Sequence, residues 1–373
     1  MYQHTRFNNK NNIFQKVGNL DYVLLSCLLI LGFISLATMY STDGGEILFH
    51  TRSHFIKFVI FFLMMIMISF INIKFWFSLG YLSYAVILGM LIWTINFGIT
   101  ASGSKRWIDL YFLNLQPSEL MKIFIILCLA KYFHRMKTQH VNSFYAICFS
   151  LIIIFVPMSL VIIQPDLGTS LLIAISGIVV LWFAGLNHKY FFYSCLLSII
   201  SLPIIISFLK PYQKLRVLTF LNPDRDPLGA GYQIIQSKIA VGSGGITGKG
   251  FLKGTQTKFD FVPAQTTDFI FCTVGEEQGW LGGTLIMILF GAFFLRLLKI
   301  AERQKSSFVR IYGYSAVSIM FFHFAINIAM TIGLVPVIGI PLPFFSYGGS
   351  SLWTFTMLLF ILLKLDSQRM KIL

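Results

Sequence analysis

Long apolar runs separated by short polar segments make up most of this chain. A helix needs about 20 residues to cross roughly 30 Å of hydrocarbon, and ten runs reach or approach that length. They cover 20–40, 54–73, 75–97, 117–133, 144–163, 168–186, 190–209, 269–298, 308–333 and 350–364. The pattern predicts an all-α polytopic integral membrane protein with about ten transmembrane helices, in which residues 1–373 form a single membrane domain.

The composition supports the same class. Hydrophobic residues make up 56% of the 373 residues and charged residues only 12%, whereas soluble domains carry about 25% charged residues. So few charges cannot coat a globule of this size, which excludes a soluble enzyme and a disordered chain. The five cysteines form no CxxC pair, so neither a disulfide framework nor a zinc site is expected.

The net charge of +15 first suggests nucleic acid, but the basic residues lie mostly between the apolar runs. With a cytoplasmic N-terminus, the inside segments carry 16 Lys and Arg and the short outside loops carry 3. Cytoplasmic loops are enriched in Lys and Arg. We therefore expect both termini in the cytoplasm and no nucleic-acid partner.

A long loop, 210–268, then lies outside the membrane between the seventh and eighth spans. Loops of this length are usually functional. Residues 229–240 are expected to form a short helix at the membrane surface, with Tyr232, Ile235 and Ile239 on one face. The glycines of 242–250 lack the spacing of a nucleotide loop, so we interpret them as flexible backbone that approaches a ligand or partner.

Ionisable residues near the spans are functional candidates because they are costly at bilayer depth. Glu119 and Lys122 share a helix face and form either a structural ion pair or the lining of a polar cavity. Arg106, beside Trp107, is either a snorkelling cation of an aromatic belt or part of a site. Asp166 lies in a Pro-Asp turn signal that suits a tight turn equally well.

Asp268 lies at the outer start of the eighth span, where it suits a helix cap or a reactive carboxylate. Glu276 and Glu277 follow about 12 Å further along a continuous helix. That is too far for a glycosidase-type pair, which needs about 5–9.5 Å, so a catalytic carboxylate here acts alone. Glycines at 275, 279 and 283 predict a face that packs against another helix.

Seven motifs together make the chain resemble the SEDS (shape, elongation, division and sporulation) family of bacterial membrane proteins, most closely its RodA branch. The resemblance runs from the first span to the last. The motifs are KRWIDL, QPSELMK, QPDLGTS, NPDRDPLGAGYQIIQS, a glycine loop ending in GKG, VPAQTTDFIFCTVGEEQG and GIPLPFFSYGGSS.

The resemblance implies a ten-span peptidoglycan glycosyltransferase that polymerises lipid II on the outer face of the cytoplasmic membrane, here during cell-wall elongation. It also implies a class B penicillin-binding protein as partner. The family's essential aspartate falls on Asp268, its intramembrane pair on Glu119 and Lys122, and its QPDLGTS aspartate on Asp166. Its Arg-Trp pair falls on the KRWIDL motif. Family members commonly have Glu at 264 and often His at 266, where this chain has Ala and Thr.

The implied chemistry needs a base for the attacking hydroxyl and cations for the diphosphate leaving group. Asp268 is the candidate base, and it should stay ionised unless desolvation dominates. The candidate cations are Arg106, Arg216, Lys238 and Lys249, and Gln233 joins the candidate substrate contacts. No cofactor is specified. A divalent cation, Mg²⁺ or Mn²⁺, could share the work, although no His/Asp cluster indicates a site.

Two alternatives stay open. Intramembrane carboxylates also suit a lipid II flippase or another transporter. A non-catalytic scaffold that activates a penicillin-binding protein would tolerate replacement of Asp268.

Overall fold

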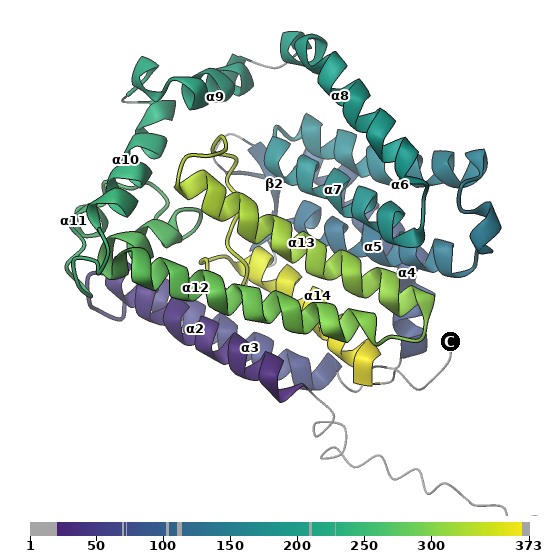
Figure 1. Cartoon of the computed structure of the whole chain (residues 1–373), viewed down its shortest axis with the longest axis horizontal. Helices are drawn as coiled ribbons and strands as arrows, with labels where there is room; N and C mark the ends of the chain where they lie inside the picture. The colour runs from purple at the N-terminus through teal and green to yellow at the C-terminus, as the bar shows by residue number, and fades with distance from the viewer. Residues whose placement is uncertain are drawn as a thin grey trace, which may run out of the picture.

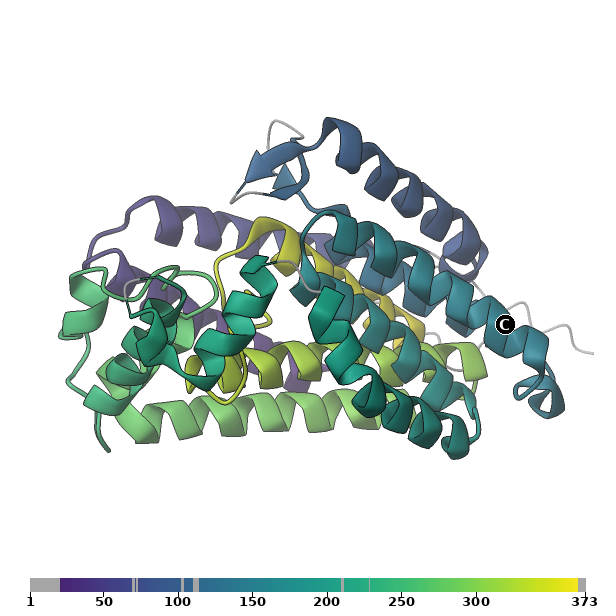
Figure 2. The ribbon, with the colours of Figure 1, turned by 90° about the horizontal axis from the view of Figure 1, so that it is seen from above.

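The protein is a bundle of long helices with a small sheet and a cluster of short helices at one end (Figures 1 and 2). The computed structural model describes residues 21–68, 71, 73–101, 104–109, 114–208, 211–227 and 229–367. Its long helices are α2 (Tyr22–Thr42), α3 (Phe49–Ile68), α4 (Ile73–Phe97), α5 (Pro117–His134), α6 (Phe144–Ile163), α7 (Leu167–Ala184), α8 (His188–Phe208), α12 (Ile270–Glu302), α13 (Ser307–Thr331) and α14 (Gly349–Ser367).

Each predicted span coincides with one of these helices, so the polytopic helical class is confirmed. Within the described residues, seven are long and apolar enough to cross a membrane: α2, α4, α6, α7, α12, α13 and α14. The number of crossings and the side of the termini stay predictions. Residues 1–20 and 368–373 lie outside the described part of the chain.

Local sequence signals set several helix starts. The side chain of Asp21 accepts a hydrogen bond from the Leu24 amide at 3.2 Å, and Ser143 accepts one from Ala146 at 3.3 Å. Both are N-caps that satisfy otherwise free amides. Pro117 occupies the first position of α5, where its missing amide hydrogen costs nothing.

Helix α5 forms the centre of the bundle and packs against α4, α6, α7, α13 and α14. Almost all its side chains are buried, so it does not need a lipid-facing apolar surface. This explains how a spanning helix can carry Glu119 and Lys122. Helix α8 lies at the rim (Figure 1), with most of its side chains exposed.

A three-stranded antiparallel sheet, which the sequence analysis did not predict, caps one end of α4 and α5. Its strands are β1 (Ile99–Ala101), β2 (Ser104–Asp109) and β3 (Asn114–Leu115), with β2 in the middle. Strand β2 carries Arg106 and Trp107 and contacts α4 and α5. The sheet therefore fixes Arg106 at the end of the bundle where α5 begins.

The long loop contains α9 (Pro211–Leu221), a 3₁₀ turn (Pro223–Arg225), α10 (Ala230–Ser243) and α11 (Thr255–Lys258). Helices α8, α9 and α10 form an arch around this end of the bundle (Figure 1). Helix α10 is the short helix expected from the sequence. Its packed residues are Ile234, Ser237 and Ala240, whereas the predicted apolar face of Tyr232, Ile235 and Ile239 is more exposed.

The glycine repeat of α12 forms the expected helix-packing face only in part. Gly275 lies against α10, where an added Cβ would meet the Val241 Cα at 3.2 Å. At Gly279 the backbone leaves the helix, with φ 65° and ψ −161°, a conformation that favours glycine. The glycine loop fills this break. The amides of Trp280 and Leu281 donate to the carbonyls of Gly245 and Ile246 at 2.9 and 3.1 Å.

The same break is bridged in the other direction. The amides of Lys249 and Gly250 donate to the carbonyls of Glu276 and Glu277 at 3.0 and 2.9 Å. A Cβ on Gly248 would lie only 2.1 Å from the Glu277 carbonyl oxygen. The glycines of 242–250 therefore allow close backbone contact with the chain's own helix, which is the partner they approach.

Candidate functional site

Asp268 lies in a tight turn, residues 264–269, directly before α12. The amides of Thr267 and Phe269 both donate to the Ala264 carbonyl, at 3.0 and 3.2 Å. The structure therefore places Asp268 just outside the helix, as expected, but its side chain does not cap α12, whose N-cap residue is Phe269. We call residues 264–269 the Asp268 turn.

The Asp268 carboxyl is partly buried, and the guanidinium groups of Arg106 and Arg216 lie near enough to act on it electrostatically. Burial raises its pKa to about 6, against the opposing effect of the positive charges of Arg106 and Arg216. The negative charge of Asp166 adds to the increase. Desolvation thus outweighs the neighbouring cations, and the group still loses its proton below neutral pH.

Arg106 and Asp166 form an ion pair that links the sheet to the start of α7. Nη1 of Arg106 lies 2.8 Å from Oδ2 of Asp166, and Gln116 donates to the same oxygen at 3.1 Å. The other oxygen accepts from the Thr169 amide at 3.1 Å. Asp166 is therefore both a helix cap and an ionic partner.

The Arg106 side chain keeps some binding capacity despite this pair. Its Nε is buried and has no hydrogen-bond partner among the described residues, and the side chain is 27% exposed. Arg106 is therefore held by protein contacts, in contrast to the snorkelling interpretation. Trp107 follows it on β2, opposite Ile99, and is half-buried.

The remaining candidates of the long loop are spread over the same end of the bundle. Nη1 of Arg216 donates to the Val337 carbonyl at 3.4 Å, which brings α9 to the loop 333–348. The exposed Lys238 lies against Gly333, where an added Cβ would meet Lys238 Cε at 2.0 Å. Gln233 is half-buried on α10. Roles of Gln233 and Lys238 in substrate contact stay predictions.

Lys249 pairs with Glu276 and not with Asp268. Oε1 of Glu276 accepts from Lys249 Nζ at 2.7 Å and from the Gln256 amide at 2.9 Å. Glu277 accepts a hydrogen bond from Ser41 at the end of α2. The two acids therefore anchor the 249–257 segment, and each is bound by partners within the fold.

Glu119 and Lys122 form a fully enclosed cluster with a third residue that sequence reasoning missed. Nζ of Lys122 lies 2.9 Å from both carboxylate oxygens of Glu119 and 2.8 Å from Nε2 of His323 on α13. All three side chains are buried. The signal was available, since His323 is an ionisable residue inside a predicted span.

A groove of about 700 Å³ lies between α3 and α14. Its walls include Ile56, Ile60 and Trp353, and it is also lined by Arg52 and Lys57. The sequence analysis did not single out either cation as a candidate site residue. Nζ of Lys57 lies 3.1 Å from the Tyr347 hydroxyl and 4.2 Å from the centre of its ring, so the groove adjoins the loop 333–348.

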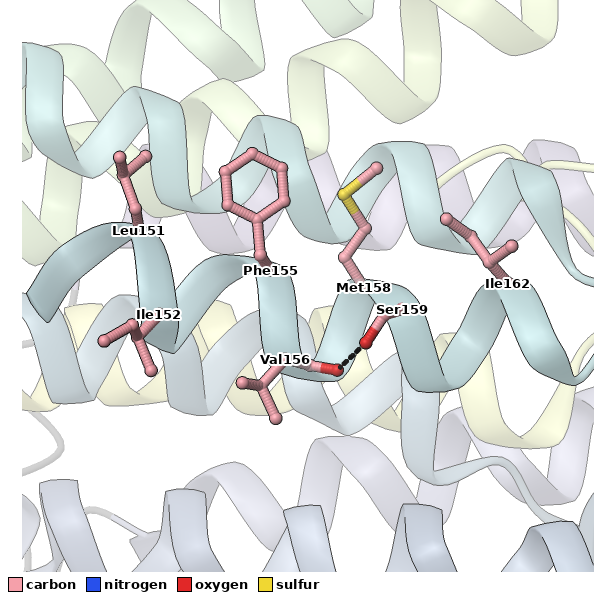
Figure 3. A pocket seen from close by; sticks show the side chains of 7 residues that line it. All are labelled: Leu151, Ile152, Phe155, Val156, Met158, Ser159 and Ile162. Carbon is pink, nitrogen blue, oxygen red and sulfur yellow. Dashed lines mark hydrogen bonds between the residues drawn. The ribbon is translucent and has the colours of Figure 1, made fainter. Parts of the chain in front are cut away.

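Two further observations delimit the site. A second hollow lies on α6 (Figure 3), where all seven lining residues belong to that helix and none is ionisable. It therefore offers no chemistry.

Among the described residues, no group of three or more His, Cys, Asp and Glu side chains could hold a metal ion, so a divalent cation for the diphosphate stays a prediction.

These features define a multi-pass helical membrane protein with a partly buried carboxylate near two arginines at one end of its bundle. The chain belongs to the FtsW/RodA/SpoVE family, described as cell cycle proteins, which matches residues 19–371. The resemblance drawn from the motifs is thus confirmed.

Relatives and solved structures agree with this assignment. The peptidoglycan glycosyltransferase MrdB of Escherichia coli K12 is 38% identical over 345 residues, which is 92% of each chain. The peptidoglycan glycosyltransferase RodA of Treponema pallidum is 29% identical and covers 95% of this chain and 99% of its own. A chain from a peptidoglycan synthase complex, in a study of coordinated polymerization and crosslinking, superimposes with a TM-score of 0.80. It shares 27% identity and covers 95% of this chain and 99% of its own.

Proposed function

We propose that this protein is a peptidoglycan glycosyltransferase that polymerises lipid II, an undecaprenyl-diphosphate-linked disaccharide peptide, during cell-wall elongation. It works on the outer face of the bacterial cytoplasmic membrane with a class B penicillin-binding protein. The relatives named above support the activity. The observation that carries the chemistry is the Asp268 carboxyl, with a pKa of about 6 beside two arginines.

The reaction joins two glycans by a single displacement. The 4-hydroxyl oxygen of one sugar attacks the anomeric carbon of a lipid-linked glycan while Asp268 takes the hydroxyl proton. The bond from the anomeric carbon to the diphosphate oxygen breaks, and its electron pair leaves with the lipid diphosphate. An α-linked donor then gives a β-linked product, because attack comes from the opposite face.

The position of Asp268 suits a general base. A base works best when its pKa lies near the operating pH, and a pKa of about 6 leaves the carboxylate mostly ionised at pH 7. An ordinary Asp, with a pKa of 3.8, would be ionised but much less basic. The same burial that raises the pKa also strengthens the interactions of the carboxylate with nearby charges.

Arg106 and Arg216 are the cations best arranged for the diphosphate. Both act on Asp268 electrostatically, so both lie close to the reacting atoms. The buried Nε of Arg106, which has no hydrogen-bond partner in the described part of the chain, offers a donor that a phosphate oxygen would satisfy. Planar guanidinium groups bind phosphate in two-pronged contacts. A donor left buried without a partner costs about 1–3 kcal/mol, which favours a ligand there.

The groove between α3 and α14 suits the lipid part of the substrate. Its apolar walls match a prenyl chain, and the charges of Arg52 and Lys57 complement the diphosphate. We assign the Glu119–Lys122–His323 cluster to shaping the bundle around the site. A Glu119→Ala protein should then insert normally and polymerise poorly, and normal polymerisation would contradict that role.

The transporter alternative is less well supported. A proton-coupled carrier needs ionisable groups along a path through the bilayer. Glu276 and Glu277, the two acids in the first half of α12, bind Lys249 and Ser41. The scaffold alternative is separated from catalysis by experiment.

The test is glycan polymerisation from lipid II by the full chain with its cognate penicillin-binding protein. We expect polymer from the wild type and none from a folded, partner-bound Asp268→Asn variant. Asp260→Asn is the matched control, since Asp260 lies in the same loop and bonds Gln265 at 2.6 Å. Equal polymer from wild type and Asp268→Asn would favour the scaffold. Absence of polymer from an intact wild-type complex would favour lipid translocation.

A further inference from the structure

Three consecutive backbone carbonyls of the Asp268 turn accept hydrogen bonds from another part of the fold. The Thr266 carbonyl accepts from the Tyr347 amide at 2.9 Å. The Thr267 carbonyl accepts from the Ser346 hydroxyl at 2.5 Å. The Asp268 carbonyl accepts from the Asn327 side chain at 2.8 Å. These carbonyls precede α12, so the helix itself does not satisfy them.

Asn327 differs from the other two donors because it joins three elements. Its Nδ2 group lies on α13 and also donates to the Ile340 carbonyl at 2.6 Å, so its two hydrogens bind the turn and the loop 333–348 together. The side chain is fully buried. A buried amide that uses both hydrogens on two separate segments fixes the distance between them.

The second segment is the one that contacts the reactive carboxyl. A Cβ on Gly339, next to Ile340, would lie 3.3 Å from Asp268 Oδ2, so the carboxyl rests against this loop. Arg216 donates to Val337 of the same loop. Asn327 therefore sets the position of the carboxyl relative to the loop and to the arginine that acts on it.

We propose that Asn327 is a positioning residue for the glycosyl transfer, which holds Asp268 in register with the 333–348 loop without touching substrate. The inference rests on the proposed function, because it assigns Asp268 the reacting role. A displacement of about 1 Å in a reacting group can cost about 100-fold in rate. Loss of the bridge should therefore lower turnover far more than it weakens lipid II binding.

The test compares variants of the full chain in complex with its penicillin-binding partner, with lipid II as substrate. Asn327→Leu keeps a side chain of similar size and removes both donated hydrogen bonds. Thr331→Val is the matched control, since Thr331 is one turn further along α13 and equally buried. Among the described residues, its hydroxyl bonds only the Ile328 carbonyl of its own helix, at 2.7 Å. Ser346→Ala removes the neighbouring donor and serves if Asn327→Leu does not fold.

We expect Asn327→Leu to lower kcat about 10- to 100-fold with KM for lipid II changed less than about threefold. The pH below which its rate falls, which is the acid limb of the pH profile, should be lower than in the wild type. A loosened turn admits water to Asp268, which favours the ionised carboxylate. Thr331→Val should match the wild type in both respects. Ser346→Ala should change kcat in the same direction by a smaller factor.

A purely structural role would reduce the amount of folded protein and leave kcat per active molecule and the acid limb unchanged. That result in Asn327→Leu overturns the proposal. If Asn327→Leu does not fold, the same result in Ser346→Ala overturns it. Asp268→Asn belongs in the same series. Full activity of Asp268→Asn overturns the proposed function and this inference together, whereas wild-type kinetics of Asn327→Leu beside an inactive Asp268→Asn overturn this inference alone.

Discussion

Replacing Arg216 by Gln should move the pH dependence of polymerisation toward higher pH. The general base must be deprotonated to act, so kcat/KM rises with pH through the pKa of Asp268 in the free enzyme. The wild type should therefore show an acid limb near pH 6. Arg216 favours the ionised carboxylate, so its removal makes the proton harder to lose and raises that pKa.

The magnitude follows from the surroundings of the carboxyl. A pKa of about 6 in place of 3.8 means that burial disfavours the carboxylate by a net value of about 3 kcal/mol, even with both arginines present. Two unit charges about 7 Å apart interact by about 2 kcal/mol at an effective dielectric constant near 20. Arg216 is exposed, and solvent screening reduces this to about 1 kcal/mol.

An effect of about 1 kcal/mol corresponds to an acid limb between about pH 6.5 and 7 for Arg216→Gln. The measurement is the initial rate of lipid II polymerisation at subsaturating substrate, from pH 5 to 8.5, for the intact complex. Lys214→Gln is the matched control, since it removes a cation from the same helix, where Lys214 bonds Ser207 at 3.0 Å. Its limb should stay near that of the wild type.

Two results would refute this reasoning. An acid limb near pH 4 in the wild type would mean that burial does not dominate the ionisation of Asp268. A limb that is unmoved in Arg216→Gln, or displaced equally in Lys214→Gln, would mean that Arg216 exerts no specific effect. Added salt should narrow the difference between wild type and Arg216→Gln, because Arg216 is reached by solvent ions.

Three further changes have defined outcomes. Asp166→Asn keeps a capping acceptor for α7 but removes a negative charge that raises the pKa of Asp268. In the same rate assay, the acid limb should therefore move to lower pH, in the opposite direction to Arg216→Gln. Lys122→Met leaves Glu119 buried without its partner and should lower the free energy of unfolding by about 3–5 kcal/mol, as measured by thermal unfolding in detergent. The double variant Glu119→Gln/Lys122→Met should lose less stability than Lys122→Met. Glu276→Gln removes the ionic partner of Lys249 and should speed limited proteolysis between 249 and 257 while α12 stays folded.

Much of the fold could be predicted because hydrophobic length and helix signals are local. The run that begins at Pro117 and the turn at Asp166 were both located by residues within a few positions of the feature. The small sheet was not predictable in the same way. Strands β1 and β3 are only three and two residues long, too short to produce an alternating pattern.

The site was only half predictable for a different reason. Asp268 and Arg106 were found through motifs, but their surroundings depend on contacts between distant segments. Asn327 and Tyr347 lie 59 and about 80 residues from the turn they hold, and nothing in their own neighbourhood indicates that contact. The glycines of 275–283 show a further limit of prediction from sequence. The same four-residue spacing fits both a helix-packing face and a break in the helix.

The exchange of hydrogen bonds at Gly279 has a consequence for how this family's loops can be recombined. Four amides and four carbonyls pair across the break, so residues 245–250 supply hydrogen bonds that an uninterrupted turn of α12 would otherwise make within the helix. A chimera that imports the long loop from a relative must keep glycine at 248 and 279, because Cβ atoms there would lie 2.1 and 2.3 Å from the opposing backbone. The loop and the first half of α12 should be transplanted, and should evolve, as one unit.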